Sequence, residues 1–415
     1  MMPVRGLINL PGDKSISHRA LMLSALTGGE CIIRNLSTGN DVESTRFCLL
    51  QCGISSTKSY GEVRVKGGKF TQPQKSLNCG NSGTTMRLLA GLLAGQGISA
   101  KFMGDSSLSK RPMNRIIDPL TQMGVHFQSD DGHLPITMMT NSVTGISYCP
   151  PVASAQVKSA ILLAALGAEG KTIVSESIKT RDHTENMLKE MGADIQAKDK
   201  IIVKKLDQPL DKFETTIPGD PSSAAFFAVL TAILPNSDIS INNILANPTR
   251  TGIFRILKKM GAGVEWHNLH TEFGELVGDL RIYSQPLNGI DITKELVPSI
   301  IDELPAIAVL ASQAESPTSV SGAAELRVKE SDRVTAICSN LSKMGCDVVE
   351  KHDGFIIYPG KRMYNTNINT FGDHRIAMAF TIAGYITPER NIIDDEDCIN
   401  ISFPEFNSIL ESLIK

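Results

Sequence analysis

Several short polar segments of the chain hold residue types that could bind anions and transfer protons. The densest is Glu325–Arg333, in which six of the nine residues are ionisable. If this segment opens a helix, Lys329 and Arg333 lie four residues apart on one face, with Glu330 beside them. A run of charges is more often a solvated helix face. The other polar segments must therefore decide whether this one binds a ligand.

Similar polar groups stand before apolar runs elsewhere in the chain, where helices are expected to begin. In order, they are Lys14–Arg19, Asn81–Thr85, Ser154–Gln156, Asp220–Ser223, Asp302–Glu303 and Asp373–Arg375. Ser, Asn and Asp are ordinary N-cap residues, so capping alone explains any single one of these groups. Several equivalent helix starts would instead offer free N–H groups and positive dipole ends to one anionic ligand.

Basic side chains also gather near the expected helix starts. They are Lys14, Arg19, Arg111, Arg181, Lys329, Arg333 and Arg375. Cations at a helix N-terminus oppose the helix dipole, so helix stability does not explain them. They carry more charge than one phosphate needs, which indicates two phosphorylated or carboxylated substrates. Asp302 and Glu330 are candidates for proton transfer, and the surrounding cations favour their base form.

The polar segments recur about every 70 residues, which indicates a repeated fold unit. One helix in each unit is expected to end at a leucine, a sulfur-containing residue and a glycine suited to the left-handed C′ position. The five places are Leu49–Gly53, Leu120–Gly124, Leu188–Gly192, Leu257–Gly261 and Leu341–Gly345. Leu410 and Leu413 resemble a sixth copy without the glycine. A strand pair is expected after four of them, clearest at 194–204 and 347–358.

Each unit is interpreted as a helix, a strand, a second helix and a hairpin. The first helices are expected to begin near Ser15, Gly83, Gln156, Ser222, Glu303 and His374. Six units predict an α/β protein of two domains with three units each. The turn-rich Ile217–Pro221 marks the boundary between them. We assign residues 13–217 to one domain and residues 1–12 with 218–415 to the other, so the chain crosses twice at a hinge.

Composition and charge exclude several classes of protein. Hydrophobic residues make up 41% of the chain and charged residues 20%, as in soluble globular proteins. The net charge of -3 argues against a general nucleic-acid binder. No apolar run is long enough to span a membrane, and no secretory signal is recognisable. Eight cysteines without a C-x-x-C pair indicate reduced thiols. We expect a cytoplasmic protein without nucleic-acid or membrane partners.

Familiar cofactor and metal motifs are missing from the sequence. Pro11–Ser15 lacks the glycine spacing of a phosphate-binding loop, and no dinucleotide fingerprint occurs. Cys48 and Cys52 stand four residues apart, but no histidine nearby completes a metal site. The sequence therefore predicts neither a metal nor a cofactor.

Four segments resemble the signatures of the 5-enolpyruvylshikimate-3-phosphate (EPSP) synthase family of enolpyruvyl transferases. They are PGDKSISHRAL at 11–21, NSGTTMR at 81–87, LRVKESDR at 326–333 and DHRIAMA at 373–379. The resemblance covers essentially the whole chain. It implies transfer of the enolpyruvyl group of phosphoenolpyruvate to the 5-hydroxyl of shikimate 3-phosphate, on the route to chorismate and the aromatic amino acids.

The resemblance also implies a fold and an assembly. The fold would consist of two inside-out α/β barrel domains, each of three βαβαββ-type units. The active site would lie in the cleft between the domains, with shikimate 3-phosphate mainly on the side of residues 13–217. We expect a monomer that needs no cofactor.

Carried over by position, the resemblance assigns residues to both substrates. Phosphoenolpyruvate would be bound by Lys14, Asn81, Gly83, Arg111, Gln156, Arg333 and Arg375. Shikimate 3-phosphate would be bound by Ser15, Arg19, Ser154, Gln156, Arg181, Asp302 and Lys329. The family's addition–elimination route needs a base for the 5-hydroxyl and an acid for the methylene carbon. Asp302 and Glu330 are the candidates, with Lys14 assisting the proton movements and the departing phosphate.

Three positions depart from the family's pattern. Ala155 stands where members often have a second serine, which removes a hydroxyl from the shikimate 3-phosphate site. Ile401 stands where many have a lysine, so one cation for phosphoenolpyruvate is missing or comes from elsewhere. Leu88 stands where members sensitive to the inhibitor glyphosate usually have proline. We therefore predict weaker inhibition by glyphosate than in sensitive members.

Two alternatives from the sequence stay open at this point. The related UDP-N-acetylglucosamine enolpyruvyl transferases share the fold and the donor, but Ser106 takes the position of their cysteine. The run Arg327–Glu330 also favours the shikimate interpretation. A non-enzymatic anion-binding repeat protein is the other alternative. It would have no use for Asp302 and Glu330 among the cations, and the net charge speaks against nucleic acid as its ligand.

Overall fold

The chain folds into two units that are built from the same succession of elements. The computed structural model describes residues 2–360 and 362–414. The N-terminal unit consists of Gly12–Ile217 together with Glu272–Glu275. The C-terminal unit consists of Met1–Pro11, Pro218–Thr271 and Leu276–Lys415.

The N-terminal unit repeats the order helix, strand, helix and hairpin three times. Its elements are α1 (Lys14–Ser24), β2 (Glu30–Arg34), α2 (Asn40–Gln51), β3 (Ser55–Ser59), β4 (Glu62–Lys66), β5 (Leu77–Asn78), α3 (Gly83–Gly95), β6 (Ala100–Met103), η1 (Leu108–Lys110), α4 (Asn114–Gln122), β7 (His126–Asp130), β8 (His133–Met139), β9 (Ser147–Tyr148), α5 (Ala155–Ala165), β10 (Lys171–Val174), α6 (His183–Glu190), β11 (Ile195–Ala197), β12 (Ile201–Lys204) and β13 (Glu214–Thr216).

The C-terminal unit follows the same order, and short 3₁₀ helices (η) lie between its longer elements. Its elements are β1 (Arg5–Asn9), α7 (Pro221–Ile233), β14 (Asp238–Leu245), α8 (Gly252–Met260), β15 (Gly263–Glu272), β16 (Glu275–Tyr283), β17 (Asp291–Ile292), η2 (Val297–Ser299), α9 (Leu304–Ala311), β18 (Thr318–Val320), η3 (Ala324–Val328), α10 (Arg333–Lys343), β19 (Asp347–Lys351), β20 (Gly354–Tyr358), β21 (Asn367–Ile368), α11 (His374–Ala383), η4 (Gly384–Ile386), β22 (Ile392–Ile393), η5 (Asp397–Ile401) and α12 (Phe406–Leu413).

Each repeat forms its own small sheet, and the four-stranded sheets are mixed. The strand orders are β13-β2-β4-β3, β5-β6-β8-β7, β9-β10-β12-β11, β1-β14-β16-β15, β17-β18-β20-β19 and β21-β22. The first two strands in each order pair in parallel. In the four-stranded sheets the second and third strands are antiparallel, as a hairpin returning to the same sheet requires.

Two sheets recruit their first strand from a distant part of the sequence. Strand β1 pairs with β14, with Arg5 opposite Asp238. Strand β13 pairs with β2, with Glu214 opposite Ile32. The first repeat of the N-terminal unit is thus closed by the last strand of that unit. The N-terminal strand of the chain closes the fourth repeat.

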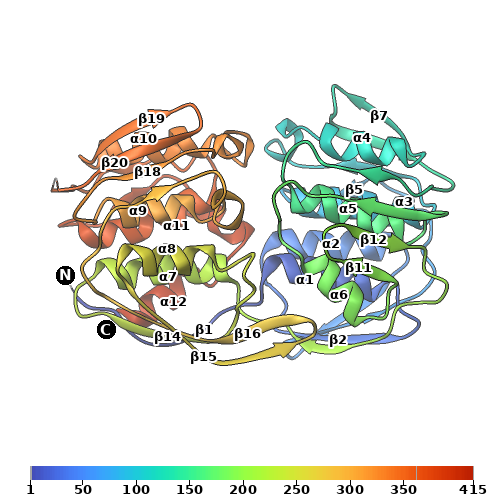
Figure 1. Ribbon diagram of the computed structural model, residues 1–415, viewed down its shortest axis with the longest axis horizontal. Helices are drawn as coiled ribbons and strands as arrows, with labels where there is room; N and C mark the ends of the chain where they lie inside the picture. The colour runs from blue at the N-terminus through green and yellow to red at the C-terminus, as the bar shows by residue number, and fades with distance from the viewer. Residues whose placement is uncertain (1, 361, 415) are drawn as a thin grey trace. The chain divides into compact units, whose positions relative to one another are not determined.

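The first helix of each repeat lies in the middle of its unit, with the sheets outside (Figure 1). In the N-terminal unit α3 contacts α1 and α5, and in the C-terminal unit α7, α9 and α11 contact one another. These helices consist largely of small and apolar residues and are buried nearly all round, as in α7, whose residues 221–232 are all buried. Outer strands such as β4 alternate buried and exposed residues. Central helices and outer sheets make the inside-out α/β arrangement that the resemblance implied.

The predicted helix ends are confirmed, and one expectation about hairpins is wrong. The five predicted terminal glycines have positive φ, namely Gly53, Gly124, Gly192, Gly261 and Gly345. Hairpins follow all five helices, whereas the sequence predicted four. Strand β3, Ser-Ser-Thr-Lys-Ser, has no apolar alternation to reveal it. Its pairing with β4 makes it a strand.

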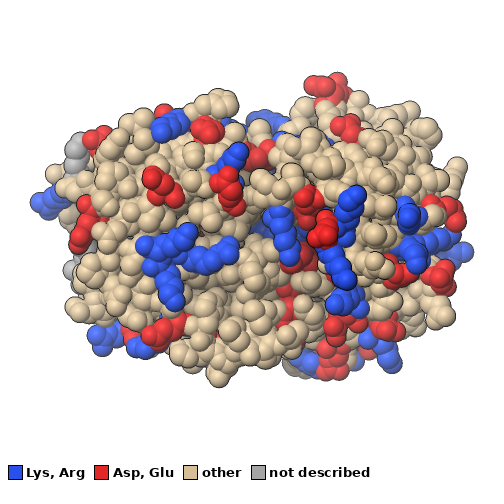
Figure 2. Space-filling view, in the orientation of Figure 1, with Lys and Arg blue, Asp and Glu red and all other residues tan. Residues whose placement is uncertain are grey.

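Charged side chains of both signs are interspersed on the face shown in Figure 2. A group of basic side chains lies over the place of α8, whose last turn holds Lys258 and Lys259. The helix dipole favours cations at this end, so the group needs no ligand to explain it. Among the described helices, none is long and apolar enough to cross a membrane. The free cysteines are buried except Cys149.

Candidate functional site

Five of the six central helices begin at a side-chain cap, as their residue types predict. The caps of α1, α3, α5, α7 and α11 are Asp13, Ser82, Ser154, Asp220 and Asp373. Before α9, Glu303 makes no such hydrogen bond. A cap satisfies one of the four N–H groups that a helix start leaves without an intrahelical partner. The structure therefore supports the capping interpretation, and ligand binding has to be argued from the side chains around these starts.

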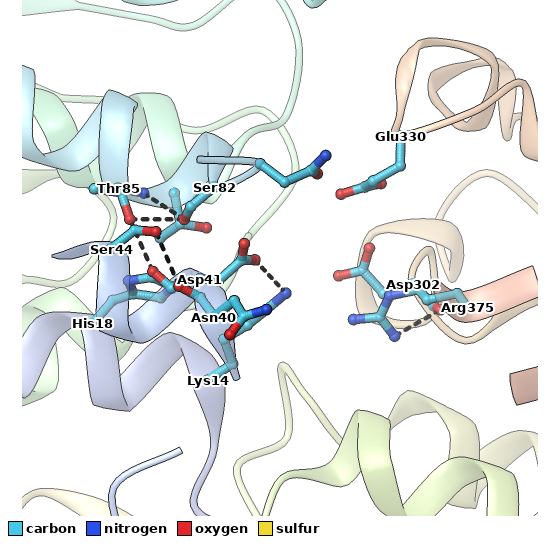
Figure 3. Close-up of polar contacts among 12 residues, drawn as sticks. Lys14, His18, Asn40, Asp41, Ser44, Ser82, Thr85, Asp302, Glu330 and Arg375 are labelled. Carbon is cyan, nitrogen blue, oxygen red and sulfur yellow. Dashed lines mark hydrogen bonds and ion pairs between the residues drawn. The ribbon is translucent and has the colours of Figure 1, made fainter. Parts of the chain in front are cut away.

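Lys14, the first residue of α1, forms an ion pair with Asp41 of α2 (Figure 3). Lys14 Nζ lies 3.0 Å from Asp41 Oδ2, and the two side chains are 18% and 9% exposed. Asp41 lies in the first turn of α2, where the helix dipole favours a carboxylate. Asp41 is not among the sequence candidates, although an acid in a first turn is a signal that could have found it. The pair holds the ammonium in place while leaving part of it accessible.

Behind this ion pair, a buried series of hydroxyl contacts joins α1, α2 and α3. His18 Nδ1 lies 2.7 Å from Thr45 Oγ1, which lies 2.7 Å from Thr85 Oγ1. Thr85 Oγ1 donates to Ser82 Oγ, the cap of α3, at 2.7 Å (Figure 3). Sequence analysis missed this series, because its members come from three helices. It fixes the start of α3 against the helix that carries Lys14.

The His18 ring is neutral because of where it lies. Burial lowers the pKa of His18 well below the ordinary value of 6.5, and the cations Lys14 and Arg19 lower it further. Asp13 acts in the opposite direction, but its effect is smaller. A neutral ring makes His18 a hydrogen-bonding residue of the site and adds no charge to it.

Gly83 lies beside two arginines at the start of α3. A Cβ atom at Gly83 would lie 2.6 Å from Arg87 Nη1 and 3.4 Å from Arg111 Nη1. Arg87 Nη1 donates to Gln156 Oε1 at 2.7 Å, and Gln156 Nε2 donates to Thr84 Oγ1 at 2.9 Å. Gln156 of α5 is thus held against α3, and the absence of a side chain at Gly83 makes room for both guanidinium groups.

Asn81 and Arg111 form a second polar pair near the same helix start. Arg111 is 7% exposed, and its Nη2 donates to Asn81 Oδ1 at 2.6 Å. Asn81 Nδ2 in turn donates to Asp105 Oδ2 at 2.7 Å. These contacts set the orientation of the Arg111 guanidinium. An anion at this place would find a fixed, bidentate donor.

Arg19 of α1 is buried and held by neutral groups. Its Nε donates to Thr184 Oγ1 at 2.7 Å, its Nη2 to Ser159 Oγ at 2.6 Å, and its Nη1 to the Ser15 carbonyl at 2.9 Å. Burial lowers the pKa of Arg19 to about 10, and the nearby Arg181 contributes to the decrease. Two cations that come this close favour an anion between them.

In the C-terminal unit, one buried guanidinium contacts three carboxylates. Arg333, the first residue of α10, is 1% exposed. Its Nε donates to Asp373 Oδ2 at 2.7 Å and its Nη2 to Glu330 Oε2 at 2.7 Å. Its Nη1 lies 3.5 Å from Asp302 Oδ1. Asp373 is missing from the sequence candidates, which treat it as part of a helix start.

The electrostatics of this C-terminal cluster favour ionised groups. Burial alone would lower the pKa of Arg333, but Asp373 and Glu330 outweigh it and raise the pKa above its ordinary value. Burial would likewise raise the pKa of Asp373, but Arg333 outweighs it and the pKa falls. Arg333 and Asp373 thus form a buried ion pair, and Glu330 and Asp302 lie at its edge.

The placement of Arg375 and Lys329 differs from the sequence expectations in one respect. Arg375 Nη1 donates to the Asp302 carbonyl at 3.0 Å, which brings it into the C-terminal cluster (Figure 3). Lys329, however, lies in extended backbone between η3 and α10, with φ −83° and ψ −152°. It therefore shares no helix face with Arg333, and that prediction is wrong. The Asp332 side chain accepts a hydrogen bond from the Thr335 N–H and so caps α10. Helix α10 therefore begins after Asp332 and does not continue from η3.

Most sequence candidates thus fall into two clusters, one in each unit. The N-terminal cluster includes Lys14, Ser15, Arg19, Asn81, Gly83, Arg111, Ser154, Gln156 and Arg181. The C-terminal cluster includes Asp302, Glu330, Arg333, Asp373 and Arg375. The first is mainly cationic and suits anions, while the second places two carboxylates beside cations and suits proton transfer. Among the described residues no group of His, Cys, Asp and Glu could hold a metal ion.

Comparison with known proteins assigns the chain to a family. The family model of EPSP synthase (3-phosphoshikimate 1-carboxyvinyltransferase) matches residues 1–410. The 3-phosphoshikimate 1-carboxyvinyltransferase of Syntrophomonas wolfei subsp. wolfei is 45% identical, over 100% of this chain and 98% of the relative. That of Petrotoga mobilis is 48% identical, over 98% of this chain and 96% of the relative.

Solved structures agree with the sequence comparison. The EPSP synthase of Acinetobacter baumannii, solved at 2.37 Å, superimposes with a TM-score of 0.87 at 39% sequence identity. The superposition covers 100% of this chain and 97% of that chain. On sequence and on fold, over its full length, this chain belongs to the EPSP synthase family.

Proposed function

We propose that this chain transfers the enolpyruvyl group of phosphoenolpyruvate to the 5-hydroxyl of shikimate 3-phosphate, giving 5-enolpyruvylshikimate 3-phosphate and phosphate. The family membership and the named relatives support this reaction. The structural observation that carries the proposal is the position of Glu330 and Asp302 beside the buried Arg333 guanidinium. The reaction needs groups that both accept and return protons, and these carboxylates are held ready to accept them.

The anionic groups of both substrates find matching cations in the N-terminal cluster. For phosphoenolpyruvate we propose Lys14, Asn81, Gly83, Arg111 and Gln156, joined by Arg333 and Arg375 of the C-terminal cluster. The Nη1 of Arg333 makes the longest of its carboxylate contacts, so we assign that nitrogen to phosphoenolpyruvate. For shikimate 3-phosphate we propose Ser15, Arg19, Ser154, Gln156, Arg181, Asp302 and Lys329. The buried Arg19 and the adjacent Arg181 are the strongest support for a phosphate on this side.

The chemistry divides into an addition and an elimination. In the addition, the 5-hydroxyl oxygen bonds to C2 of the enolpyruvyl group, a base takes the hydroxyl proton, and the methylene carbon receives a proton. In the elimination, the new methyl group gives up a proton, and the bond between C2 and the phosphate oxygen breaks. We assign the proton transfers to Asp302 and Glu330, and the stabilisation of the departing phosphate to Lys14.

The match to the EPSP synthase family leaves no observation that favours UDP-N-acetylglucosamine as acceptor. We propose that each substrate is enclosed by residues of both units and that residues 13–217 provide most of the shikimate 3-phosphate site. Monomeric state and cytoplasmic location stay predictions.

The proposed reaction is tested by phosphate release from phosphoenolpyruvate. We expect release that requires shikimate 3-phosphate and does not occur with UDP-N-acetylglucosamine. Product analysis should show the enolpyruvyl ether at the 5-hydroxyl. Release without shikimate 3-phosphate, or with the UDP-sugar in its place, would overturn the proposal.

A further inference from the structure

A buried lysine lies at the base of the N-terminal cluster, and the proposed chemistry does not use it. Lys158 of α5 is 0% exposed. Its Nζ lies 2.9 Å from Glu176 Oε2 and 2.7 Å from Glu185 Oε1. Burying an ammonium and two carboxylates is costly, and the cost is recovered where each charge has a partner in good geometry. The arrangement therefore fastens three segments to one point.

The first of these segments leads directly to Arg181. One carboxylate oxygen of Glu176 pairs with Lys158 Nζ. The other oxygen accepts hydrogen bonds from the Thr180 N–H at 3.1 Å and from Thr180 Oγ1 at 2.5 Å. The loop between Glu176 and Thr180 is thereby closed on itself and tied to α5. Thr180 immediately precedes Arg181. The backbone at Arg181 therefore follows directly on a loop that Lys158 ties to α5.

The second segment is the first turn of α6, which holds Arg19. Glu185 follows Thr184, whose hydroxyl accepts from Arg19 Nε at 2.7 Å. Ser159, the neighbour of Lys158, contacts both Thr184 Oγ1 at 2.7 Å and Arg19 Nη2 at 2.6 Å. Two consecutive residues of α5 thus brace the loop before Arg181 and the start of α6, which holds the Arg19 guanidinium.

The bracing opposes an electrostatic repulsion. Arg181 lies close enough to lower the pKa of Arg19, and Glu185 is the carboxylate that most strongly raises it again. Burial raises the pKa of Glu185 itself, but the Lys158 ammonium counteracts that increase and favours the carboxylate. Without the ammonium, the loop that carries Arg181 would lose its anchor and two carboxylates would repel each other.

We infer that Lys158 is a positioning residue for phosphate recognition. Its ammonium, shared by Glu176 and Glu185, holds the loop before Arg181 and the start of α6 so that Arg19 and Arg181 meet one phosphate group. This inference rests on the proposed function, because it takes that phosphate to be the one of shikimate 3-phosphate. It assigns Lys158 no contact with either substrate.

The test compares steady-state kinetics of the full chain with those of Lys158→Met, which keeps the length of the side chain and removes the ammonium. We expect KM for shikimate 3-phosphate to rise by about tenfold or more, since displacement of binding groups is costly. KM for phosphoenolpyruvate and kcat should change by less than about threefold, because the partners of Lys158, Glu176 and Glu185, lie on segments that carry none of the residues proposed for phosphoenolpyruvate. A general loss of structure would change all three parameters together.

A second variant keeps the inference testable if Lys158→Met does not fold. Glu176→Gln keeps the acceptor for Thr180 and the Lys158–Glu185 pair, and it weakens the tie between α5 and the loop. It should raise KM for shikimate 3-phosphate in the same selective way, by about threefold or more. The matched control is Lys204→Met, which removes an exposed ion pair with Asp194 in the same unit and should leave the kinetics unchanged.

The outcomes separate this inference from the proposed function. If the wild-type chain releases no phosphate with shikimate 3-phosphate, the proposed function fails. If the wild type is active and both variants retain its KM for shikimate 3-phosphate, the positioning role of Lys158 is refuted while the function stands. Equal increases in KM for the two substrates would also refute it.

Discussion

Arg333 Nε donates to Asp373 Oδ2 at 2.7 Å, and both side chains are buried in the C-terminal unit. Asp373 also caps α11 by accepting from the Arg375 N–H at 2.9 Å. One carboxylate thus orders the starts of two helices. The charge that it supplies lets Arg333 share its remaining donors with Glu330 and Asp302.

We predict that Asp373→Asn destabilises the fold, because asparagine preserves the cap acceptor but leaves Arg333 short of a buried counter-ion. Loss of one partner of a buried pair typically costs about 3–5 kcal/mol. Urea unfolding measures the change. The control is Asp238→Asn, which breaks an exposed pair of the same 2.7 Å length with Arg281 and should cost far less, because water screens exposed charges. Equal losses in the two variants would contradict the prediction.

We predict that Glu330→Gln binds both substrates almost normally and turns over poorly. Glutamine can still accept from Arg333 Nη2, which lies 2.7 Å from Glu330 Oε2, so the cluster should keep its shape. It cannot exchange a proton, and such a loss lowers turnover by about a hundredfold or more. Binding titrations with single-turnover kinetics separate the two effects. Normal turnover would remove Glu330 from the chemistry. Glu350→Gln, which alters an exposed pair with Arg327, is the control.

We predict that Gly83→Ala selectively weakens the use of phosphoenolpyruvate. The added Cβ would lie 2.6 Å from Arg87 Nη1, so Arg87 must move and release Gln156. KM for phosphoenolpyruvate should rise by about tenfold, while stability changes little. Gly68→Ala is the control, because a Cβ there meets nothing within 4 Å. An unchanged KM for phosphoenolpyruvate would show that Arg87 does not support this site.

The same assay tests the prediction about glyphosate. Leu88 is buried in α3, five residues after Gly83, where sensitive members of the family usually have proline. We expect weaker inhibition of this chain than of those members. An inhibition constant equal to theirs would refute the expectation.

The sequence predicted the repeats well because their signals are local. A cap such as Ser82 and a terminal glycine such as Gly261 lie within a few residues of the helix that they bound, so the order of residues reveals them. The partners of the charged residues, in contrast, lie far away in the sequence. Arg333 finds Asp373 40 residues away, and Arg19 finds Thr184 165 residues away. Such contacts depend on how the repeats stack, which local patterns do not determine.

The break before α10 shows a second limit of sequence interpretation. Charge spacing alone placed Lys329 and Arg333 on one helix face. The competing cap at Asp332, reinforced by a 2.8 Å ion pair with Arg327, decided the structure instead. The individual residues of the site were therefore easier to identify than their geometry.

We predict that His18, which burial keeps neutral in the folded protein, makes the stability of the fold depend on pH. In the unfolded chain its pKa returns to the ordinary value near 6.5, whereas in the fold it lies well below that value. Between these two values the unfolded state holds more protons, so stability rises with pH across this window. Acid should therefore destabilise the protein from about pH 6.5 downward, by at most ~1.4 kcal/mol per pH unit from this residue.

His18→Asn isolates this contribution, because asparagine can still bond to Thr45 and does not titrate. The wild type should be the more stable protein at pH 7.5, and its advantage should shrink by about 1 kcal/mol at pH 5.5, as measured by urea unfolding. His126→Asn is the control, because that ring is exposed on β7 and leaves water little on folding. Parallel stability curves for the wild type and His18→Asn would mean that His18 takes up a proton in the fold, and that the hydroxyl series behind Lys14 tolerates a charge.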